Sequence, residues 1–222
     1  MADKVVAFGA SDGFGALVGW ELQGSGSGVI SDRAAVLDDT GNEADSILFN
    51  ERTEGSSTYQ SNLSGSAPTI PASIGALVNG LVLTSISLST TQNGHVTMTL
   101  TGHNHTENAH AAEPALASVA HGVTLDDGFG VTDFFGGTAG DNAAPISSNL
   151  TISCEHADVQ DEVGDHFVGE NYNPRMSGSV QWAGVPTGTD DASWDVTVET
   201  TDTGNVNFLT TTVNGEKALT FA

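Results

Sequence analysis

The sequence carries one pattern twice, as FNERTEGSSTY at residues 49–59 and as YNPRMSGSVQW at residues 172–182. The offset is 123 (175 − 52). At this offset arginine aligns with arginine, Gly-Ser aligns with Gly-Ser, and an aromatic residue aligns with an aromatic residue at both ends. An acidic turn precedes each copy, at residues 38–41 and at residues 161–164. Internal repetition constrains the architecture of a chain more than any local motif, so we predict a duplicated unit.

A second pair of matching stretches follows in the same order. Residues 86–91 (ISLSTT) resemble residues 196–201 (VTVETT) at an offset of 110 (196 − 86). The first stretch belongs to a clear hairpin pattern, in which residues 81–89 and 95–101 alternate apolar and small polar side chains around Asn93-Gly94. Asn-Gly between two alternating runs is a strong signal for a β-hairpin. The repeated unit is therefore predicted to consist of antiparallel strands.

The composition also favours strands and turns. The chain of 222 residues holds 27 glycines, many serines and threonines, and few of the polar residues that favour helices. We expect an all-β fold of internally duplicated β-sandwich or barrel units with one long inserted loop region. The expected divisions are an N-terminal arm or edge strand at 1–26, a first β repeat at 27–102, a His- and Gly-rich insertion at 103–147, and a second β repeat at 148–222. Short helices are expected within residues 72–80 and 113–120.

The charge balance is strongly acidic. Five Lys and Arg residues stand against 28 Asp and Glu residues, for a formal net charge of −23. Such a surface repels nucleic acid and anionic lipid, so we expect no specific nucleic-acid binding and no membrane association. It suits a lumen past which DNA slides without sticking, and it equally suits plain solubility or a salty habitat.

The single cysteine, Cys154, excludes an intrachain disulfide. The N-terminus lacks the basic and apolar regions of a signal peptide, and no apolar run approaches the ~20 residues that span a bilayer. We therefore expect a protein made in the cytosol, or assembled there into something larger. Cys154 lies on an apolar stretch and is expected to be a small buried side chain rather than a nucleophile.

Two kinds of residue could bind a metal ion. His103 and His105 form an H-x-H pair, which places both imidazoles on one face of a strand, and His110 is a candidate third ligand. The competing interpretation is a polar loop that lies against another subunit. The acidic turns around Asp38 and Asp161 offer oxygen ligands for calcium, but neither matches an EF-hand loop. The expected cofactors are therefore none, with Zn or Ca as the alternatives to test.

Arg52 and Arg175 occupy the same place in the two repeats of a chain that is poor in basic residues. We expect each to pair with a carboxylate of the adjacent strand or of a neighbouring subunit. Together with the matching aromatic residues Tyr59 and Trp182, they are predicted to stabilise the repeats or the contacts between subunits. No nucleophile motif accompanies them, so the protein is expected not to be an enzyme.

The second half, from Ile152 through the segment 169–175 to Trp182, resembles the C-terminal part of small structural proteins of tailed-bacteriophage virions. The hairpin at residues 84–101 and the following GHNH at residues 102–105 are similar in the same way. The resemblance covers most of residues 30–222 and lies in arrangement rather than in a diagnostic motif. It implies a virion component of the tail tube or head–tail connector kind, built of β units that assemble into rings. It carries over no catalytic residue.

The resemblance leads to a prediction of a tail tube or neck subunit. It would form a trimeric or hexameric ring, contact other virion proteins, and reach the virion after assembly in the host cytoplasm. A capsid decoration protein is one alternative. A carbohydrate- or cation-binding β-sandwich module is another, and it would require Tyr172, Trp182 and Trp194 to form an exposed platform. A metal-dependent enzyme is the third, and it would require zinc at the histidine pair.

Overall fold

The computed structural model describes residues 6–7, 13–61, 68–91, 94–105, 118–125, 131–132, 143–162, 166–187, 193–202 and 209–221. The predicted all-β class is confirmed, since every regular element among these residues is a strand. The described part of the chain contains no helix with the length and apolar character needed to cross a bilayer.

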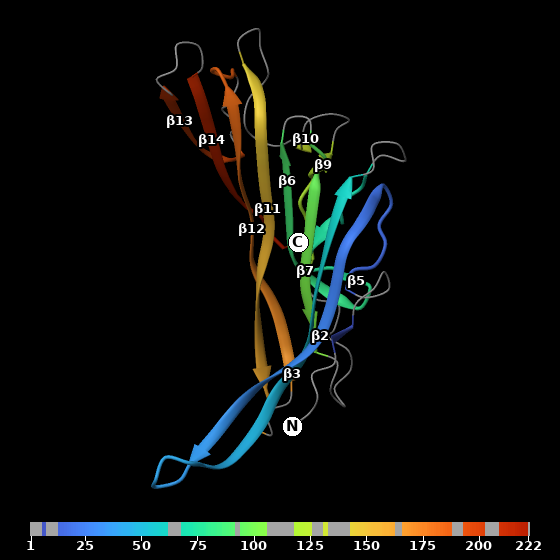
Figure 1. The fold of residues 1–222 in the computed structure, drawn as a ribbon, viewed down its shortest axis with the longest axis vertical. Helices are drawn as coiled ribbons and strands as arrows, with labels where there is room; N and C mark the ends of the chain where they lie inside the picture. The colour runs from blue at the N-terminus through green and yellow to red at the C-terminus, as the bar shows by residue number, and fades with distance from the viewer. Residues whose placement is uncertain are drawn as a thin grey trace.

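One large antiparallel sheet dominates the structure (Figure 1). Its strands are β1 (Val6–Ala7), β2 (Trp20–Leu37), β3 (Glu43–Ser61), β5 (Leu77–Val78), β6 (Leu81–Thr91), β7 (Thr97–Asn104), β11 (Ala144–Gln160), β12 (His166–Ala183), β13 (Asp195–Asp202) and β14 (Leu209–Ala218). The order across the sheet is β1-β2-β3-β7-β6-β11-β12-β14-β13, and β5 pairs with β6. Two small sheets pair β4 (Ser73–Ile74) with β8 (Val119–Ala120), and β9 (Thr124–Leu125) with β10 (Val131–Thr132).

Two long hairpins, β2–β3 and β11–β12, have the same internal register. Ile30 lies opposite Arg52 in the first and Ser153 lies opposite Arg175 in the second, so both partners differ by 123 residues. The register shifts also coincide: they follow residues 22, 30 and 36 in the first hairpin and residues 145, 153 and 159 in the second. The offset between the two copies in the sequence is thus also the offset between the two hairpins.

A second hairpin follows each long one and packs against its returning strand. β7 lies beside β3 with Gly102 opposite Gly55, and β14 lies beside β12 with Gly215 opposite Gly178. The outer strands β6 and β13 come next, so both sets follow the same spatial order. Val198 lies opposite Val213 as Ile86 lies opposite Leu100. This register matches residue 86 with residue 198, two residues further than the offset of 110 predicts.

The core lies along the middle of the sheet, where the two sets of strands meet. Alternate residues of β6, β7 and β11 point to one side and are fully buried, including Ile86, Leu100 and Ile152. Segments outside the large sheet cover this side and contribute buried apolar side chains to the same cluster, namely Phe14, Ile74, Val119 and Val123. Each such side chain stabilises the fold by about 1.5–3 kcal/mol through its removal from water.

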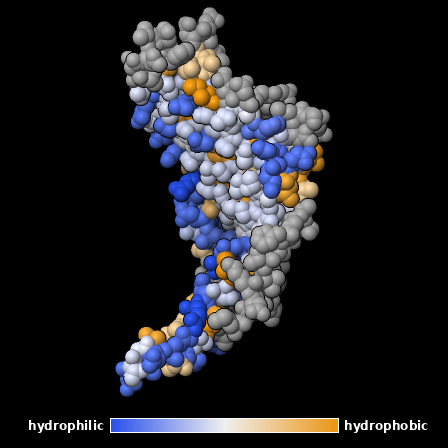
Figure 2. Space-filling view, viewed as in Figure 1, coloured by the Kyte–Doolittle hydropathy of each residue, from blue (hydrophilic) through white to orange (hydrophobic). Residues whose placement is uncertain are grey.

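The hairpin β2–β3 continues beyond the body of the protein as an arm (Figure 1). The arm comprises residues 33–48, all of which are exposed. Four of its large apolar side chains lie more than half exposed: Val36, Leu37, Ile47 and Leu48. Figure 2 shows apolar patches among polar atoms on this arm.

The short helix expected within residues 72–80 is wrong. This segment contains β4 and β5 instead, and Gly75, Asn79 and Gly80 have φ angles of 82°, 49° and 82°. Left-handed residues at these positions interrupt a right-handed helix. Of the second expected helix, residues 113–117 lie outside the described residues, and Val119–Ala120 forms β8.

Candidate metal centre

The C-terminal end of β7 presents the predicted histidine pair. His103 is in the strand and His105 follows its last residue, so both side chains lie on the same side of the chain. His105 is 3% exposed, and its two ring nitrogens and Nε2 of His103 are shielded from solvent. The H-x-H spacing thus places two imidazoles side by side, with ring centroids 5.5 Å apart.

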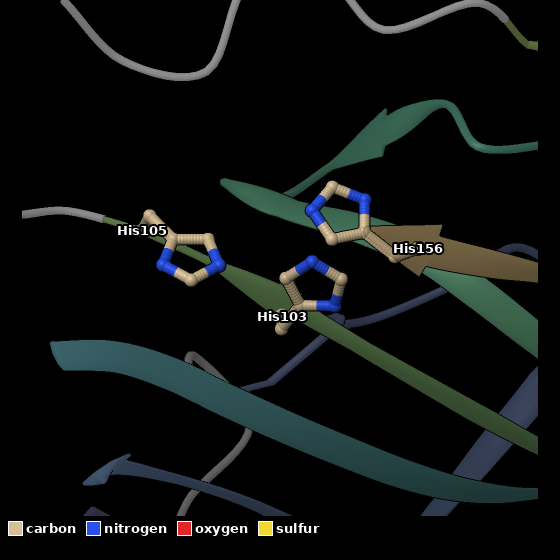
Figure 3. Close-up of side chains that lie close together, drawn as sticks. All are labelled: His103, His105 and His156. Atoms are coloured by element: carbon tan, nitrogen blue, oxygen red, sulfur yellow. The ribbon is translucent and has the colours of Figure 1, made fainter. Parts of the chain in front are cut away.

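The third imidazole comes from β11, on the other side of β6. β11 pairs with β6 as far as Ser153, opposite Ser85, and then continues along β12, where His156 lies opposite Asn171. The ring centroid of His156 lies 4.3 Å from that of His103 and 6.1 Å from that of His105. The three rings converge (Figure 3), and one nitrogen from each lies within 4.8 Å of the other two.

A buried amide fixes the orientation of His156. Its Nδ1 lies 2.9 Å from Oδ1 of Asn171, which is only 3% exposed. An amide oxygen only accepts hydrogen bonds, so Nδ1 carries the hydrogen and Nε2 keeps its lone pair. Metal-binding histidines in proteins are typically held in this way by a hydrogen bond on the second ring nitrogen.

A surface groove of about 690 Å³ reaches the cluster at His103 and His156. Glycines and small polar residues of β2, β3 and β7 form most of its wall, and Arg52 and Glu54 add charge. Small residues are required at one point, because a Cβ on Gly102 would press against the carbonyl oxygen of Val82 and the ring of Phe14. His103 and His156 thus form part of the groove wall, whereas His105 lies behind them.

The structure therefore changes the predicted ligand set. His103 and His105 lie together as predicted, while His110 lies outside the described residues. The third histidine of the cluster is His156, which was not among the predicted ligands. The H-x-H pair is visible in the sequence, but the contact with His156 depends on the order β7-β6-β11 in the sheet.

Arg52 pairs with carboxylates of its own hairpin. Its guanidinium lies 3.5 Å from Asp32 on the adjacent strand and 3.0 Å from Glu54 on its own strand. At the matching place in the second hairpin, Arg175 stands near Glu155. The Asn173 amide and the Tyr172 hydroxyl, followed by the Arg175 charge, lower the pKa of that carboxyl. Residues 32 and 155 also differ by 123, so the arrangement of arginine and acid recurs.

The matching aromatic residues Tyr59 and Trp182 both lie in the core, 0% and 5% exposed. The Tyr59 hydroxyl donates a hydrogen bond of 2.7 Å to the carbonyl oxygen of Gly15. Trp194 is also buried, at 7%, whereas Tyr172 is 43% exposed. Trp182 and Trp194 are therefore not available for an exposed aromatic platform, which argues against the carbohydrate-binding alternative.

In the first acidic turn, the Asp38 carboxylate accepts its hydrogen bonds from residues of the same turn. Oδ1 of Asp38 accepts hydrogen bonds from the backbone and hydroxyl of Thr40 and from the backbone of Asn42, at 2.7–2.9 Å. These bonds, that of the Thr40 hydroxyl foremost, lower the pKa of Asp38. Of the second turn, the side chain of Asp158 and residues 163–165 lie outside the described residues. Within the described ranges, the histidines form the one group of three possible metal ligands.

Cys154 lies two residues before His156 and is buried. Burial raises the pKa of its thiol to about 11. A thiol that stays protonated at neutral pH is a poor nucleophile.

Neither a family model nor a curated protein matches this chain.

Proposed function

We propose that the protein is a structural subunit that assembles with copies of itself into rings. Because residues 152–182 resemble structural proteins of tailed-bacteriophage virions, we assign it to a bacteriophage virion, as a tail tube or neck protein. The observation that carries the proposal is that both sets of strands have the same order in the sheet. The pairing that joins the two sets inside one chain could therefore also join one molecule to the next.

Inside the chain, the join is the pairing of β6 with β11. Ile86 lies between Leu100 of β7 and Ile152 of β11, and all three side chains are fully buried. Leu88 lies opposite Leu150 in the same join, and both are likewise buried. A continuous row of apolar side chains thus crosses from the first set of strands into the second.

The outer edge of the second set ends in the corresponding strand, β13. Val198 lies opposite buried Val213 and is itself 45% exposed, because β13 pairs only with β14 among the described strands. The offset of 123 makes Val29 of β2 the counterpart of Ile152. If β13 of one copy paired with β2 of the next in the register of the internal join, Val198 would lie against Val29 of that copy. Such a head-to-tail contact closes into a ring or continues as a filament.

β1 covers part of the β2 edge in the single chain. Val6 pairs with Gly28 and Ala7 with Ser27. Exposed sheet edges favour unwanted pairing, and a short covering strand is one way to prevent it. Assembly in the proposed register therefore requires β1 to give way to β13 of the neighbouring copy.

The arm supplies a second contact surface for a neighbouring copy. Its exposed apolar side chains lie beyond the body of the protein, on the same hairpin that contains the β2 edge. A neighbour paired along β2 would lie next to this arm. Burial of Ile47 and Leu48 would then add to the free energy of association.

The net charge of −23 suits a ring through which DNA passes, because an acidic lumen does not bind the phosphate backbone. The proposed assembly is a trimer or hexamer that contacts other virion proteins and forms in the host cytoplasm. A capsid decoration protein would also associate with itself. An open lumen in the assembly would favour the tail tube or neck protein over the capsid decoration protein.

The test is a charge placed on the β13 edge. Val198→Lys should leave the thermal unfolding of the protein unchanged and shift its mass, measured by light scattering, from a ring to a monomer. Val185→Lys is the matched control, because Val185 is 55% exposed outside β13 and the charge change is the same. Negative-stain images of the wild type and the control should show rings with a lumen. A wild type that stays monomeric at high concentration would overturn the proposal, as would a Val198→Lys variant that still forms rings.

A further inference from the structure

We infer that His103, His105 and His156 bind one zinc ion at the junction between the two sets of strands. The site goes beyond the proposed assembly, since all three ligands belong to one chain. His103 and His105 come from the first set and His156 from the second, so a bound ion would join the two sets directly.

The donor atoms suit zinc. Neutral imidazole nitrogens are common zinc ligands at 2.0–2.1 Å, and a tetrahedral ion with such bonds separates its ligand nitrogens by ~3.4 Å. One nitrogen of each ring lies within 4.8 Å of the others, so the rings need to close by an ångström or so. Rotation of the side chains can provide this movement, because the groove leaves space beside His103 and His156.

The residues around the three histidines favour the binding of a cation. The hydrogen bond from His156 Nδ1 to Asn171 places the ring hydrogen on Nδ1, so Nε2 carries the lone pair that can bind a metal ion. The ring nitrogens of His105 lie away from solvent, where fewer water molecules compete for the ion. The chain also has a net charge of −23, which raises the local concentration of divalent cations.

Three protein ligands leave a fourth position for water or another small ligand. The groove meets the cluster at His103 and His156 and does not include His105 in its wall. The fourth position is therefore expected to face the groove.

The test measures zinc bound to the 222-residue chain. The protein is stripped with a chelator, incubated with zinc, passed through gel filtration and analysed for metal. One zinc per chain should remain in the wild type and should be lost in both His103→Gln and His156→Gln. His95→Gln is the control, because His95 is exposed and bonds to the backbone of Ser61 away from the cluster. Circular dichroism of the metal-free variants shows whether each one is folded.

Cobalt provides an independent readout. Tetrahedral Co²⁺ absorbs strongly in the visible range, so one equivalent should give a d–d band in the wild type and His95→Gln but not in His156→Gln. Asn171 is a positioning residue. Asn171→Leu should weaken cobalt binding by about 10–100-fold, whereas Asn171→Asp, which still accepts the Nδ1 hydrogen, should restore it. A wild type that retains no zinc overturns the inference. Retention in both His103→Gln and His156→Gln overturns it equally.

Discussion

The join between the two sets of strands should contribute strongly to stability, and Ile152→Ala tests this. Ile152 is fully buried, between Ile86 on one side and Met176 on the other. The substitution removes three carbon atoms, which corresponds to about 2.4 kcal/mol of lost burial at ~0.8 kcal/mol per carbon. The cavity that remains adds to this loss. We expect the free energy of unfolding to fall by about 3–4 kcal/mol.

Ile47→Ala is the matched control, with the same chemical change at a side chain that is 60% exposed on the arm. It should change the free energy of unfolding by less than about 0.5 kcal/mol. Urea denaturation followed by tryptophan fluorescence measures both variants, because Trp20, Trp182 and Trp194 are buried. The measurements are made on dilute, unassembled protein. A loss below about 1 kcal/mol for Ile152→Ala would refute the reasoning, as would equal losses for the two variants.

Three further predictions concern positions away from the join. Gly102→Ala should destabilise the fold, because the new Cβ would meet the carbonyl oxygen of Val82. A lower urea midpoint than wild type checks this, and an unchanged midpoint would contradict it. Tyr59→Phe should lower the free energy of unfolding by about 1–3 kcal/mol in the same assay, because the buried hydrogen bond to the carbonyl oxygen of Gly15 is lost. An unchanged free energy of unfolding would show that this bond contributes nothing to stability. Burial lowers the pKa of His121, opposed by its backbone hydrogen bond. As the pH falls, His121 therefore takes up a proton in the unfolded chain before it does so in the folded chain. The free energy of unfolding then decreases as the pH drops below about 6.5. Stability measured from about pH 7.5 to 5.5 should fall less steeply in His121→Gln, and parallel pH profiles would rule out this origin.

Much of the first hairpin pair could be predicted from the sequence because its pattern contains distinctive residues. Arg52 and Arg175, with Gly55 and Gly178, fix one offset, and the strand register has the same offset. The second pair lacks such residues. ISLSTT and VTVETT alternate in the same way, and a shift by two residues keeps every side chain on its own face. The offset of 110 is therefore two residues short of the structural one.

The candidate metal centre could be predicted only in part, for a related reason. His103 and His105 are close in sequence, and strand geometry alone brings them together. His156 is on β11, which is separated in the sheet from β7, the strand of His103, by β6. No local pattern in the sequence indicates that β11 lies beside β6. The failed helix at residues 72–80 has a local cause, since Gly75, Asn79 and Gly80 are residue types that tolerate left-handed backbone, and all three adopt it.

The two-residue strand β1 has a kinetic consequence for the proposed assembly. At about 1 kcal/mol for each backbone pair, its closure would be favoured by only ~2 kcal/mol, so about one molecule in thirty would have an open edge at any moment. Most collisions between chains would then fail to join them, and association would be about thirty-fold slower than for a chain with a permanently open edge. Removal of residues 1–8 should therefore speed assembly by about thirty-fold without changing the final assembly.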